Sequence, residues 1–288
     1  MEQEPIAITG ANGFVARNLR ALCCRMKIPV VAIARRSIKT YENETPVITQ
    51  DYRADRILPD LQRCRGMVHL VGIGRQGLGS TYSQTNVDLT RRVISMCKTA
   101  DAGKMVYCSG LGVSEYPSTD YFASKFDAER MIIGSGLDYT IFRPSYIIGA
   151  DDPLTKSVGM QIAAGTVVVP GSGRSPIQPI AVGDACRVIL QSMTDERFSR
   201  RIIDMVGPST IPFGRFVRGM VAGRAAIKQM ETETAYYEAI RNPGFPYGVD
   251  DLNILMGRFW GDHKEIQNLA GFEFATPVEM LTESGSRS

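Results

Sequence analysis

A tyrosine and a lysine four residues apart, Tyr121 and Lys125, are the first candidates for chemistry. In a helix, this spacing places both side chains on one face. A free tyrosine titrates near about pH 10 and is a poor proton donor or acceptor at neutral pH. A lysine ammonium one turn away favours the phenolate and lowers the pKa of the tyrosine. The pair therefore suits proton transfer, with Tyr121 as acid or base, although the spacing alone is common by chance.

A glycine-containing loop, Thr9-Gly10-Ala11-Asn12-Gly13-Phe14-Val15-Ala16, joins an apolar run to an amphipathic segment. Between a strand and a helix, Gly10 permits a tight turn, Gly13 lets the backbone approach a pyrophosphate, and small Ala16 lets the helix pack closely. The helix N-terminus then presents N–H groups and the positive end of its dipole to an anion. The motif predicts a dinucleotide-binding loop. The alternative is an ordinary glycine-rich turn.

The end of the second apolar run indicates which dinucleotide is bound. An NAD site usually has an acidic residue here, which accepts a hydrogen bond from the ribose 2′-hydroxyl. This chain has Arg35 and Arg36 instead, and no acid before Glu42. Two guanidinium groups suit a 2′-phosphate, so NADP(H) is predicted over NAD(H); the alternative is a pair of solvated surface arginines. Asp51 and Tyr52 follow the third apolar run, where they would meet the adenine ring.

The elements that would position these residues follow from an alternation of apolar runs and amphipathic segments. Strands are expected over 5–9, 30–34, 47–49, 67–71, 105–109 and 139–143, and helices over 14–26, 54–64, 82–100 and 122–135. The strands are continuously apolar, as in a sheet covered on both faces, and the short connections favour a parallel order. The predicted fold class is α/β, with a Rossmann-type doubly wound parallel sheet over 1–150 and with 177–206 returning to it. Residues 151–176 and 207–288 are expected to form a smaller substrate or lid region.

The composition is that of a globular protein with a substantial core, with 44% hydrophobic and 22% charged residues among 288. A formal charge of +3, spread along the chain, gives no reason to expect nucleic acid as a partner. No apolar run reaches the roughly 18 residues of a membrane span, and the acidic start Met1-Glu-Gln-Glu-Pro5 does not resemble a signal peptide. We therefore expect a cytoplasmic protein with a small-molecule substrate. A protein partner or a homo-oligomer stays open.

The thiol and imidazole groups do not predict a metal site. Six cysteines are scattered without a CxxC pair, which predicts reduced and mostly buried thiols. They are Cys23, Cys24, Cys64, Cys97, Cys108 and Cys186. The two histidines are His69 and His263, and His69 lies inside an apolar run, as expected of a strand residue.

Together these motifs resemble the short-chain dehydrogenase/reductase superfamily, in its extended and atypical branches, which include NAD-dependent epimerases and dehydratases. Four further segments carry the likeness: His69-Leu-Val-Gly72, Asn86-Val-Asp-Leu-Thr90, Tyr121-x-x-Ser-Lys125-x-x-x-Glu129 and Arg143-Pro-Ser-Tyr-Ile-Ile-Gly149. Among atypical members, residues 135–144 and 178–184 are similar to the NADPH-binding accessory subunit group of respiratory complex I.

The motifs and the resemblance imply two sets of site residues. The catalytic set is Tyr121, Lys125 and Ser109. The cofactor-binding set is Gly10, Asn12, Gly13, Phe14, Val15, Arg35, Arg36, Asp51, Tyr52, Leu70, Val71, Gly72, Asn86, Tyr121, Lys125, Pro144 and Ser145.

Two positions depart from the pattern of the extended members. Those members have Ser or Thr at the end of the fifth strand to hydrogen-bond the substrate carbonyl, and this chain has Gly110 there. Ser109 or Ser114 could stand in. Losing such a donor typically lowers a rate by about 10² to 10³. Epimerases and dehydratases usually have Asn after the sixth strand, whereas this chain has Tyr146, which disfavours a nucleotide-sugar substrate.

Three functions are compatible with these residues. The first is an NADP(H)-dependent oxidoreductase acting on a small carbonyl or enone compound, with Tyr121 as acid or base. The second is a non-catalytic NADPH-binding subunit with a structural or assembly role, which Gly110 favours. The third is a nucleotide-sugar epimerase or dehydratase.

Overall fold

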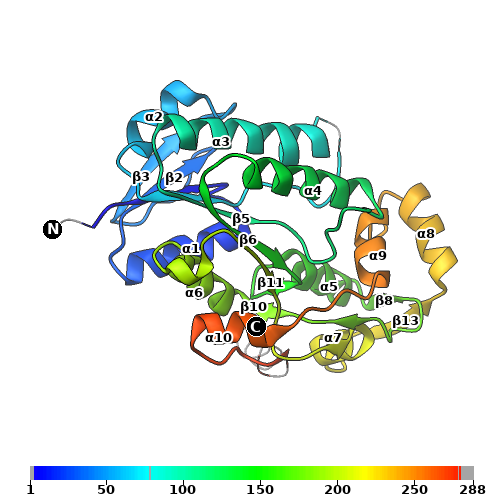
Figure 1. Ribbon diagram of the computed structural model, residues 1–288. Coiled ribbons are helices and arrows are strands. Elements are labelled where there is room, and N and C mark those ends of the chain that lie inside the picture. Colours follow the sequence, from blue (N-terminus) through cyan, green and yellow to red (C-terminus); the bar gives the residue numbers. More distant parts are fainter. Residues whose placement is uncertain (1–2, 78, 278, 280–288) are drawn as a thin grey trace. The chain divides into compact units, whose positions relative to one another are not determined.

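The computed structural model describes residues 3–77, 79–277 and 279 (Figure 1). The chain divides into two compact units, residues 1–143 with 185–203 and residues 144–184 with 204–288. Residues 280–288, which end the predicted lid region, lie outside the described residues, as do Met1 and Glu2 at the acidic start.

The first unit is organised by a seven-stranded sheet with the order β11-β6-β5-β4-β1-β2-β3. Its strands are β1 (Ile6–Thr9), β2 (Val30–Ala34), β3 (Glu44–Ile48), β4 (Gly66–His69), β5 (Lys104–Cys108), β6 (Asp138–Pro144) and β11 (Arg201–Met205). The pairings from β3 to β6 are parallel. The backbone hydrogen bonds Arg200 N to Tyr139 O and Ser145 N to Met205 O indicate that β11 runs the same way beside β6. The predicted doubly wound parallel sheet is confirmed.

Burial explains why the central strands read as unbroken apolar runs. Every residue of β1, β2 and β4 is buried, because helices cover both faces of the sheet. The edge strand β3 is different: only Val47 is buried, and Pro46 lies within the strand. Proline is tolerated there because an edge strand has unpaired N–H groups. The predicted strand over 47–49 therefore begins too late, since the first residues of β3 carry no apolar signal.

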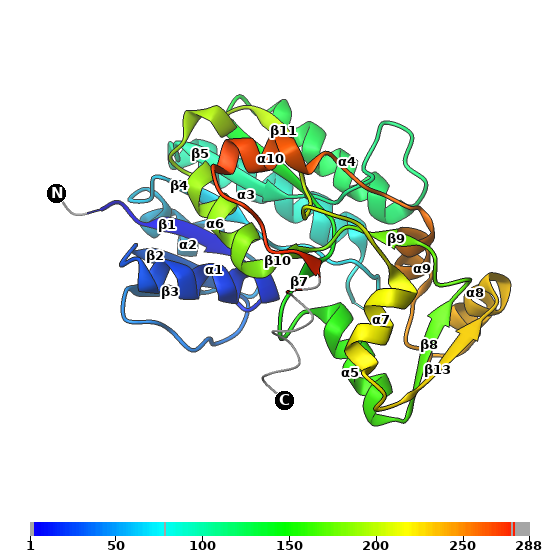
Figure 2. The ribbon, with the colours of Figure 1, turned by 90° about the horizontal axis from the view of Figure 1, so that it is seen from below.

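Helices of the first unit lie on both faces of its sheet. They are α1 (Phe14–Arg25), α2 (Ala54–Leu61), α3 (Leu89–Thr99), α4 (Asp120–Ile133), α6 (Val182–Ser192) and the 3-10 turn η2 (Glu196–Phe198). Figure 1 shows α2, α3 and α4 on one face, and Figure 2 shows α1 and α6 on the other. The predicted helix over 82–100 begins as a π-helix, η1 (Ser83–Asp88), which continues into α3.

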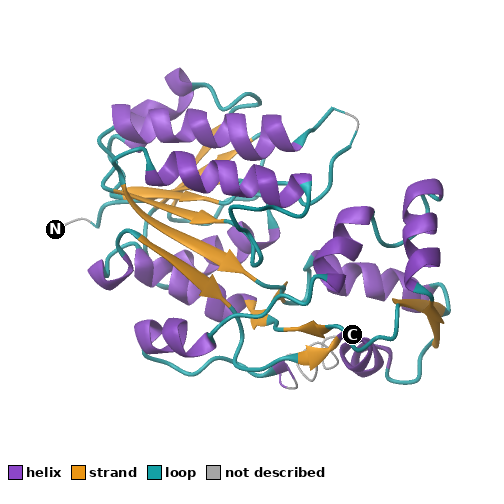
Figure 3. Cartoon of the chain, turned by 45° about the vertical axis from the view of Figure 1, so that its right-hand side comes forward, coloured by secondary structure: helices purple, strands orange, loops and turns teal. Residues whose placement is uncertain are grey.

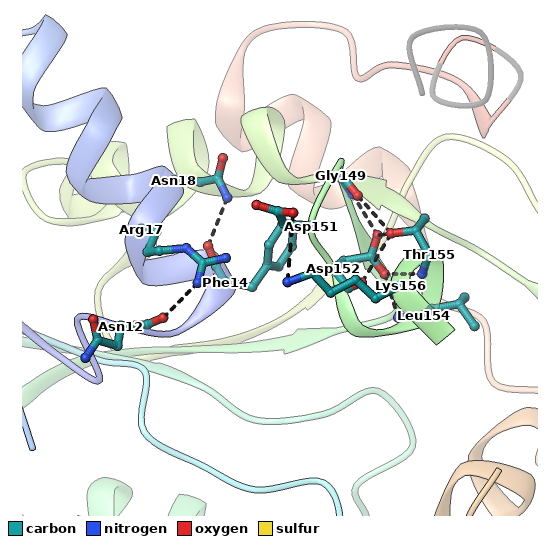
Figure 4. Close-up of polar contacts among 10 residues, drawn as sticks. All are labelled: Asn12, Phe14, Arg17, Asn18, Gly149, Asp151, Asp152, Leu154, Thr155 and Lys156. Carbon is teal, nitrogen blue, oxygen red and sulfur yellow. Dashed lines mark hydrogen bonds and ion pairs between the residues drawn. The ribbon is translucent and has the colours of Figure 1, made fainter. Parts of the chain in front are cut away.

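The second unit consists of short strand pairs and helices (Figure 3). The pairs are β7 (Ile147–Ile148) with β10 (Ile180–Ala181), β8 (Thr166–Pro170) with β13 (Ala226–Met230), and β9 (Pro176–Ile177) with β12 (Ile211–Pro212). The helices are α5 (Pro153–Ala163), α7 (Phe213–Val221), α8 (Thr232–Arg241), α9 (Val249–Met256) and α10 (His263–Ala270). The buried Asp152 carboxylate caps α5 by accepting from Leu154 N and Thr155 N (Figure 4). Among the described residues, no helix is both long and apolar enough to cross a membrane.

Candidate functional site

The glycine loop between β1 and α1 has a backbone that only small residues permit. Gly10 has φ +67°, and a Cβ there would lie 3.2 Å from the carbonyl carbon and oxygen of Leu70. Gly13 N donates to Gly10 O at 2.7 Å, which closes the turn. Asn18 Nδ2 donates to Phe14 O and Arg17 Nη1 to Asn12 O, which ties the loop to the first turns of α1 (Figure 4). The predicted tight turn is therefore present.

The N-terminus of α1 suits an anion. Gly13 is its N-cap residue, and no side chain caps the helix. The N–H groups of the first turn thus have no side-chain acceptor at the cap, while the helix dipole adds partial positive charge at this end. Phe14 and Val15, predicted to bind cofactor, are the first residues of this helix.

A cavity of about 330 Å³ lies beside this loop, within the first unit. Its lining residues are Gly10, Asn12, Gly13, Ala34, Arg35, Arg36, Tyr52, Leu70, Val71 and Gly72. They come from the last residue of β2 and from the segments that follow β1, β2, β3 and β4, at the carboxyl end of the parallel strands, where ligands bind in sheets of this kind. Of these lining residues, only Ala34 was not among the predicted cofactor-binding set.

The two arginines of the cavity are available to bind a ligand. Arg35 and Arg36 directly follow β2 and are both exposed. Neither forms an ion pair with a carboxylate of the described residues. Their guanidinium groups place positive charge at this end of the cavity, where an anionic group could be bound.

Tyr52 contacts the glycine loop through its hydroxyl. It is 4% exposed and has φ +50°, and its hydroxyl accepts a hydrogen bond from Gly10 N at 3.2 Å. Burial raises the pKa of this phenol, so the hydroxyl stays neutral. Its neighbour Asp51 is exposed and does not line the cavity. The sequence predicted an adenine contact for both residues, and it did not predict the contact between Tyr52 and the loop.

Lys125 is buried in the same unit, on α4. Its ammonium donates to Cys108 O at 3.1 Å and to the Tyr107 hydroxyl at 3.3 Å, and lies 5.0 Å from the centre of the Tyr107 ring. Burial lowers the pKa of Lys125 to about 8, against the raising effect of the Cys108 and Glu129 charges. A Cβ on Gly72 would stand 3.0 Å from Lys125 Nζ. Because Gly72 lines the cavity, the ammonium lies next to the cavity wall.

Asn86 connects the loop after β4 to α4. Its side chain is fully buried, accepting from Ile73 N at 2.9 Å and donating to Ser124 Oγ at 3.0 Å. Ser124 Oγ donates in turn to Tyr121 O at 2.7 Å. Asn86 lies in the π-helix η1, a conformation frequent at functional sites. It was predicted to bind cofactor, and it fixes the backbone around Gly72 and Tyr121.

A second hydrogen-bond chain, which the sequence did not predict, runs through His69. Its Nε2 lies 3.1 Å from Thr90 Oγ1, which donates to Asn86 O, so we assign the proton to Nε2. Nδ1 then accepts from the Thr9 hydroxyl at 2.7 Å. His69 is fully buried, and burial, with a smaller effect of Lys125, lowers its pKa to about 3. The imidazole is therefore neutral, as expected of a strand histidine.

Tyr121 projects from the first turn of α4, which Thr119 caps by accepting from Phe122 N. The Tyr121 ring packs against Tyr82 and Phe122, with ring centres 5.8 Å and 5.3 Å away. A Cβ on Gly110 would stand 3.1 Å from the Tyr121 hydroxyl. The position that holds Ser or Thr in the resembling enzymes is therefore adjacent to the phenol.

The two candidate serines differ in their surroundings. Ser109 is 4% exposed, and its hydroxyl has no hydrogen-bond partner among the described residues. Ser114 is exposed and donates to Tyr116 O at 3.1 Å. A buried hydroxyl without a partner is rare and costs free energy, so Ser109 is the better candidate for a ligand contact.

Two further predicted cofactor residues are Pro144, which ends β6, and Ser145, which follows it; both fall in the range of the second unit, as do Asp204 and Met205 at the end of β11. Ser145 N donates to Met205 O at 3.1 Å there. Among the described residues, no cluster of three or more His, Cys, Asp or Glu side chains could hold a metal ion.

The comparisons with known proteins agree with this geometry. A protein family described as NAD(P)H-binding matches residues 10–191. A curated relative, the ceramide reductase of Caulobacter vibrioides (strain NA1000 / CB15N), is 30% identical over 186 residues. The matched segment covers 62% of this chain and 58% of that relative.

Solved structures share the fold at low sequence identity. A nucleoside-diphosphate-sugar epimerase from Staphylococcus aureus superposes with TM-score 0.77 at 13% identity, covering 96% of this chain and 99% of that one. An NADPH-dependent quinone oxidoreductase from Escherichia coli, complexed with NADPH, superposes with TM-score 0.74 at 18% identity over 96% and 99% of the two chains. These likenesses establish the fold that short-chain dehydrogenases and NAD-dependent epimerases share. The resemblance to the complex I accessory subunit group stays a prediction.

Proposed function

Because the chain belongs to the NAD(P)H-binding family, we propose that it is an NADP(H)-dependent oxidoreductase of a small carbonyl or enone compound. The loop from β1 to α1 fits a pyrophosphate, since Gly10 and Gly13 leave no side chain between the backbone and a ligand. Arg35 and Arg36 are exposed at the same cavity without carboxylate partners, which favours a cofactor with a 2′-phosphate.

The observation that carries the proposal is the position of Lys125 beside Gly72. Gly72 lines the nucleotide cavity, and a side chain there would meet the Lys125 ammonium, since even a Cβ would stand 3.0 Å from Nζ. A lysine that served only to stabilise the helix would lie in solvent, as most lysines do. This one is 5% exposed and is held by Cys108 O and the Tyr107 hydroxyl.

The residues of this chain have separate roles in the proposed reaction. Tyr121 exchanges a proton with the substrate oxygen, and the positive charge of Lys125 favours the phenolate form after Tyr121 donates. Ser109, with its unsatisfied hydroxyl, hydrogen-bonds the substrate carbonyl. The nicotinamide ring, when bound, supplies or accepts the hydride.

The substrate class follows from chemistry and from one relative. Tyrosine acid–base chemistry beside a nicotinamide site suits the interconversion of a carbonyl and an alcohol. The relative at 30% identity is named a ceramide reductase. Long-chain amides that carry a ketone therefore belong in the substrate panel, alongside short ketones, aldehydes and enones.

The test is oxidation of NADPH, followed at 340 nm, with that panel and the full chain. We expect at least one carbonyl to be reduced, and Tyr121→Phe to lower the turnover of every accepted substrate. Lys125→Met should reduce turnover too, whereas Ser114→Ala serves as a matched control on an exposed serine. A Tyr121→Phe variant as fast as the wild type on all substrates would contradict the assignment of Tyr121.

A non-catalytic NADPH-binding role is the second candidate, because Gly110 removes the side chain that contacts the substrate carbonyl in the resembling enzymes. This function would give tight NADPH binding and no cofactor consumption with any carbonyl. Consumption of NADPH with at least one carbonyl, against no consumption across the whole panel, therefore separates the two functions in one set of assays.

A further inference from the structure

Arg20 of α1 and Glu44 of β3 form an ion pair inside the first unit. Arg20 Nε lies 2.7 Å from Glu44 Oε1 and Arg20 Nη2 lies 2.6 Å from Glu44 Oε2, a two-pronged contact. The side chains are only 3% and 0% exposed. Burying two charges is unfavourable unless further hydrogen bonds satisfy the remaining donors and acceptors. The hydrogen-bond partners of the remaining Arg20 and Glu44 atoms therefore show which segments this ion pair connects.

The remaining donors of Arg20 reach two backbone segments beside the nucleotide cavity. Nη1 donates to Ala11 O at 2.9 Å, in the glycine loop between Gly10 and Gly13. Nη2 also donates to Lys39 O at 2.8 Å, three residues beyond Arg36. One guanidinium thus joins the phosphate-binding loop to the segment that begins with the cavity arginines.

That segment, residues 35–43, connects β2 to β3 without a helix or strand and is mostly exposed. Tyr41, near the end of this segment, contacts both residues of the same ion pair. Tyr41 N donates to Glu44 Oε2 at 2.9 Å, and the Arg20 guanidinium lies 5.6 Å from the centre of the Tyr41 ring. Exposed irregular segments lose conformational freedom when they bind a ligand, and an anchor reduces that cost beforehand.

We propose that Arg20 and Glu44 are positioning residues for cofactor selection: they hold the arginine-bearing segment 35–43 against the glycine loop, and so favour a dinucleotide with a 2′-phosphate. This inference rests on the proposed NADP(H) function and assigns a part of it to residues outside the cavity. Lysine cannot replace Arg20, because an ammonium lacks the planar fork that contacts Glu44, Ala11 and Lys39 together.

The experiment replaces the pair with apolar residues of similar size, Arg20→Met/Glu44→Leu, so that no unpaired charge stays buried. Binding of NADPH and of NADH to the full chain is measured by calorimetry, and amide hydrogen exchange of residues 37–42 is measured without cofactor. We expect faster exchange of this segment, and a loss of NADPH affinity that exceeds the loss of NADH affinity by about tenfold. A purely structural ion pair would change the melting temperature and not the ratio of the two affinities.

Two variants complete the design. Arg20→Lys, which keeps the charge, provides the same readouts if the apolar pair does not fold. Arg197→Met removes an exposed two-pronged ion pair in the same unit, in which Arg197 Nε donates to Asp195 Oδ1 and Nη2 to Asp195 Oδ2; Arg197 does not line the cavity, so both affinities should stay unchanged. Equal loss of both affinities, or unchanged exchange of residues 37–42, would overturn the inference. A wild type that binds NADH more tightly than NADPH would contradict the proposed function alone. The role of Arg20 and Glu44 would still be tested by whether Arg20→Met/Glu44→Leu changes the ratio of the NADPH and NADH affinities.

Discussion

The hydroxyl of Tyr121 lies against the backbone of Gly110, so closely that a Cβ on Gly110 would stand 3.1 Å from the phenolic oxygen. A methyl group at residue 110 would therefore displace the hydroxyl by a few tenths of an ångström. Displacements of a reacting group by about 1 Å can lower a rate by about 10². The absence of a side chain at residue 110 thus matters for the position of Tyr121 as well as for the missing hydroxyl.

We expect Gly110→Ala to lower the turnover of an accepted carbonyl by about tenfold while leaving NADPH affinity unchanged. Steady-state kinetics and calorimetry on the purified variant measure the two quantities. Gly159→Ala, whose Cβ would meet open space, is the control and should change neither. Full activity in Gly110→Ala would mean that Tyr121 does not need this position.

Ser109→Ala should stabilise the protein and slow the reaction. Removing a buried hydroxyl that has no partner should raise the free energy of unfolding by about 1 kcal/mol, or the melting temperature by about 2–4 °C. If Ser109 contacts the substrate carbonyl, the rate should fall by about 10² to 10³. Thermal melts and turnover are compared with Ser114→Ala, whose hydroxyl is exposed. A variant with unchanged melting temperature and unchanged rate would remove Ser109 from the site.

As the pH rises, Lys125 should make turnover fall and the free energy of unfolding increase. Its pKa is lowered from 10.5 to about 8 by burial, so the folded protein releases this proton before the unfolded chain does. The unfolded state then binds more protons between about pH 8 and 10.5, and the free energy of unfolding that depends on Lys125 rises over this window. Turnover should fall over the same window, because the ammonium is lost. Urea unfolding at pH 8 and pH 10 is compared between the wild type and Lys125→Met, and only the wild type should gain the part of the stability that depends on Lys125. Wild-type and variant free energies of unfolding that change equally between the two pH values would contradict the expectation.

His69 should make the fold sensitive to acid. Its pKa is lowered from 6.5 to about 3, so the unfolded chain takes up a proton first as the pH falls. Stability due to neutral His69 is complete above pH 6.5 and is lost progressively toward pH 3. We expect His69→Gln to unfold at lower urea than the wild type at pH 7, since it disturbs the contacts with Thr9 and Thr90. The gap should narrow at pH 4.5, and a gap that widens there would show that the wild-type imidazole is not held neutral.

Much of the fold was predictable because burial on both faces leaves a plain signal. The runs that became β1, β2 and β4 are mostly apolar and buried throughout, and α1 and α2 each bury one stripe of residues. The edge strand β3 was placed too late, because exposure on most of its length removes that signal. The π-helical conformation of 83–88 was not predicted, since a widened turn depends on tertiary contacts such as those of Asn86.

The sequence predicted those parts of the candidate site whose residues lie close together in the chain. The glycine loop and the pair Tyr121 and Lys125 are visible in short stretches of sequence. The contacts of Arg20 with Glu44 are not, because the two residues are 24 positions apart and meet only when β3 forms. A signal existed even so: Arg20 lies on the buried stripe of α1 with Ala16 and Cys23, where an unpaired charge would be unfavourable.

The most direct test of the central claim is calorimetric titration of the full chain with NADPH and with NADH, for the wild type and for Arg35→Ser/Arg36→Ser. The wild type should bind NADPH more tightly, and the double variant should lose about tenfold or more in NADPH affinity with little change for NADH. If neither dinucleotide binds the folded wild type at millimolar concentration, the loop from β1 to α1 does not hold a pyrophosphate and the proposed function is wrong.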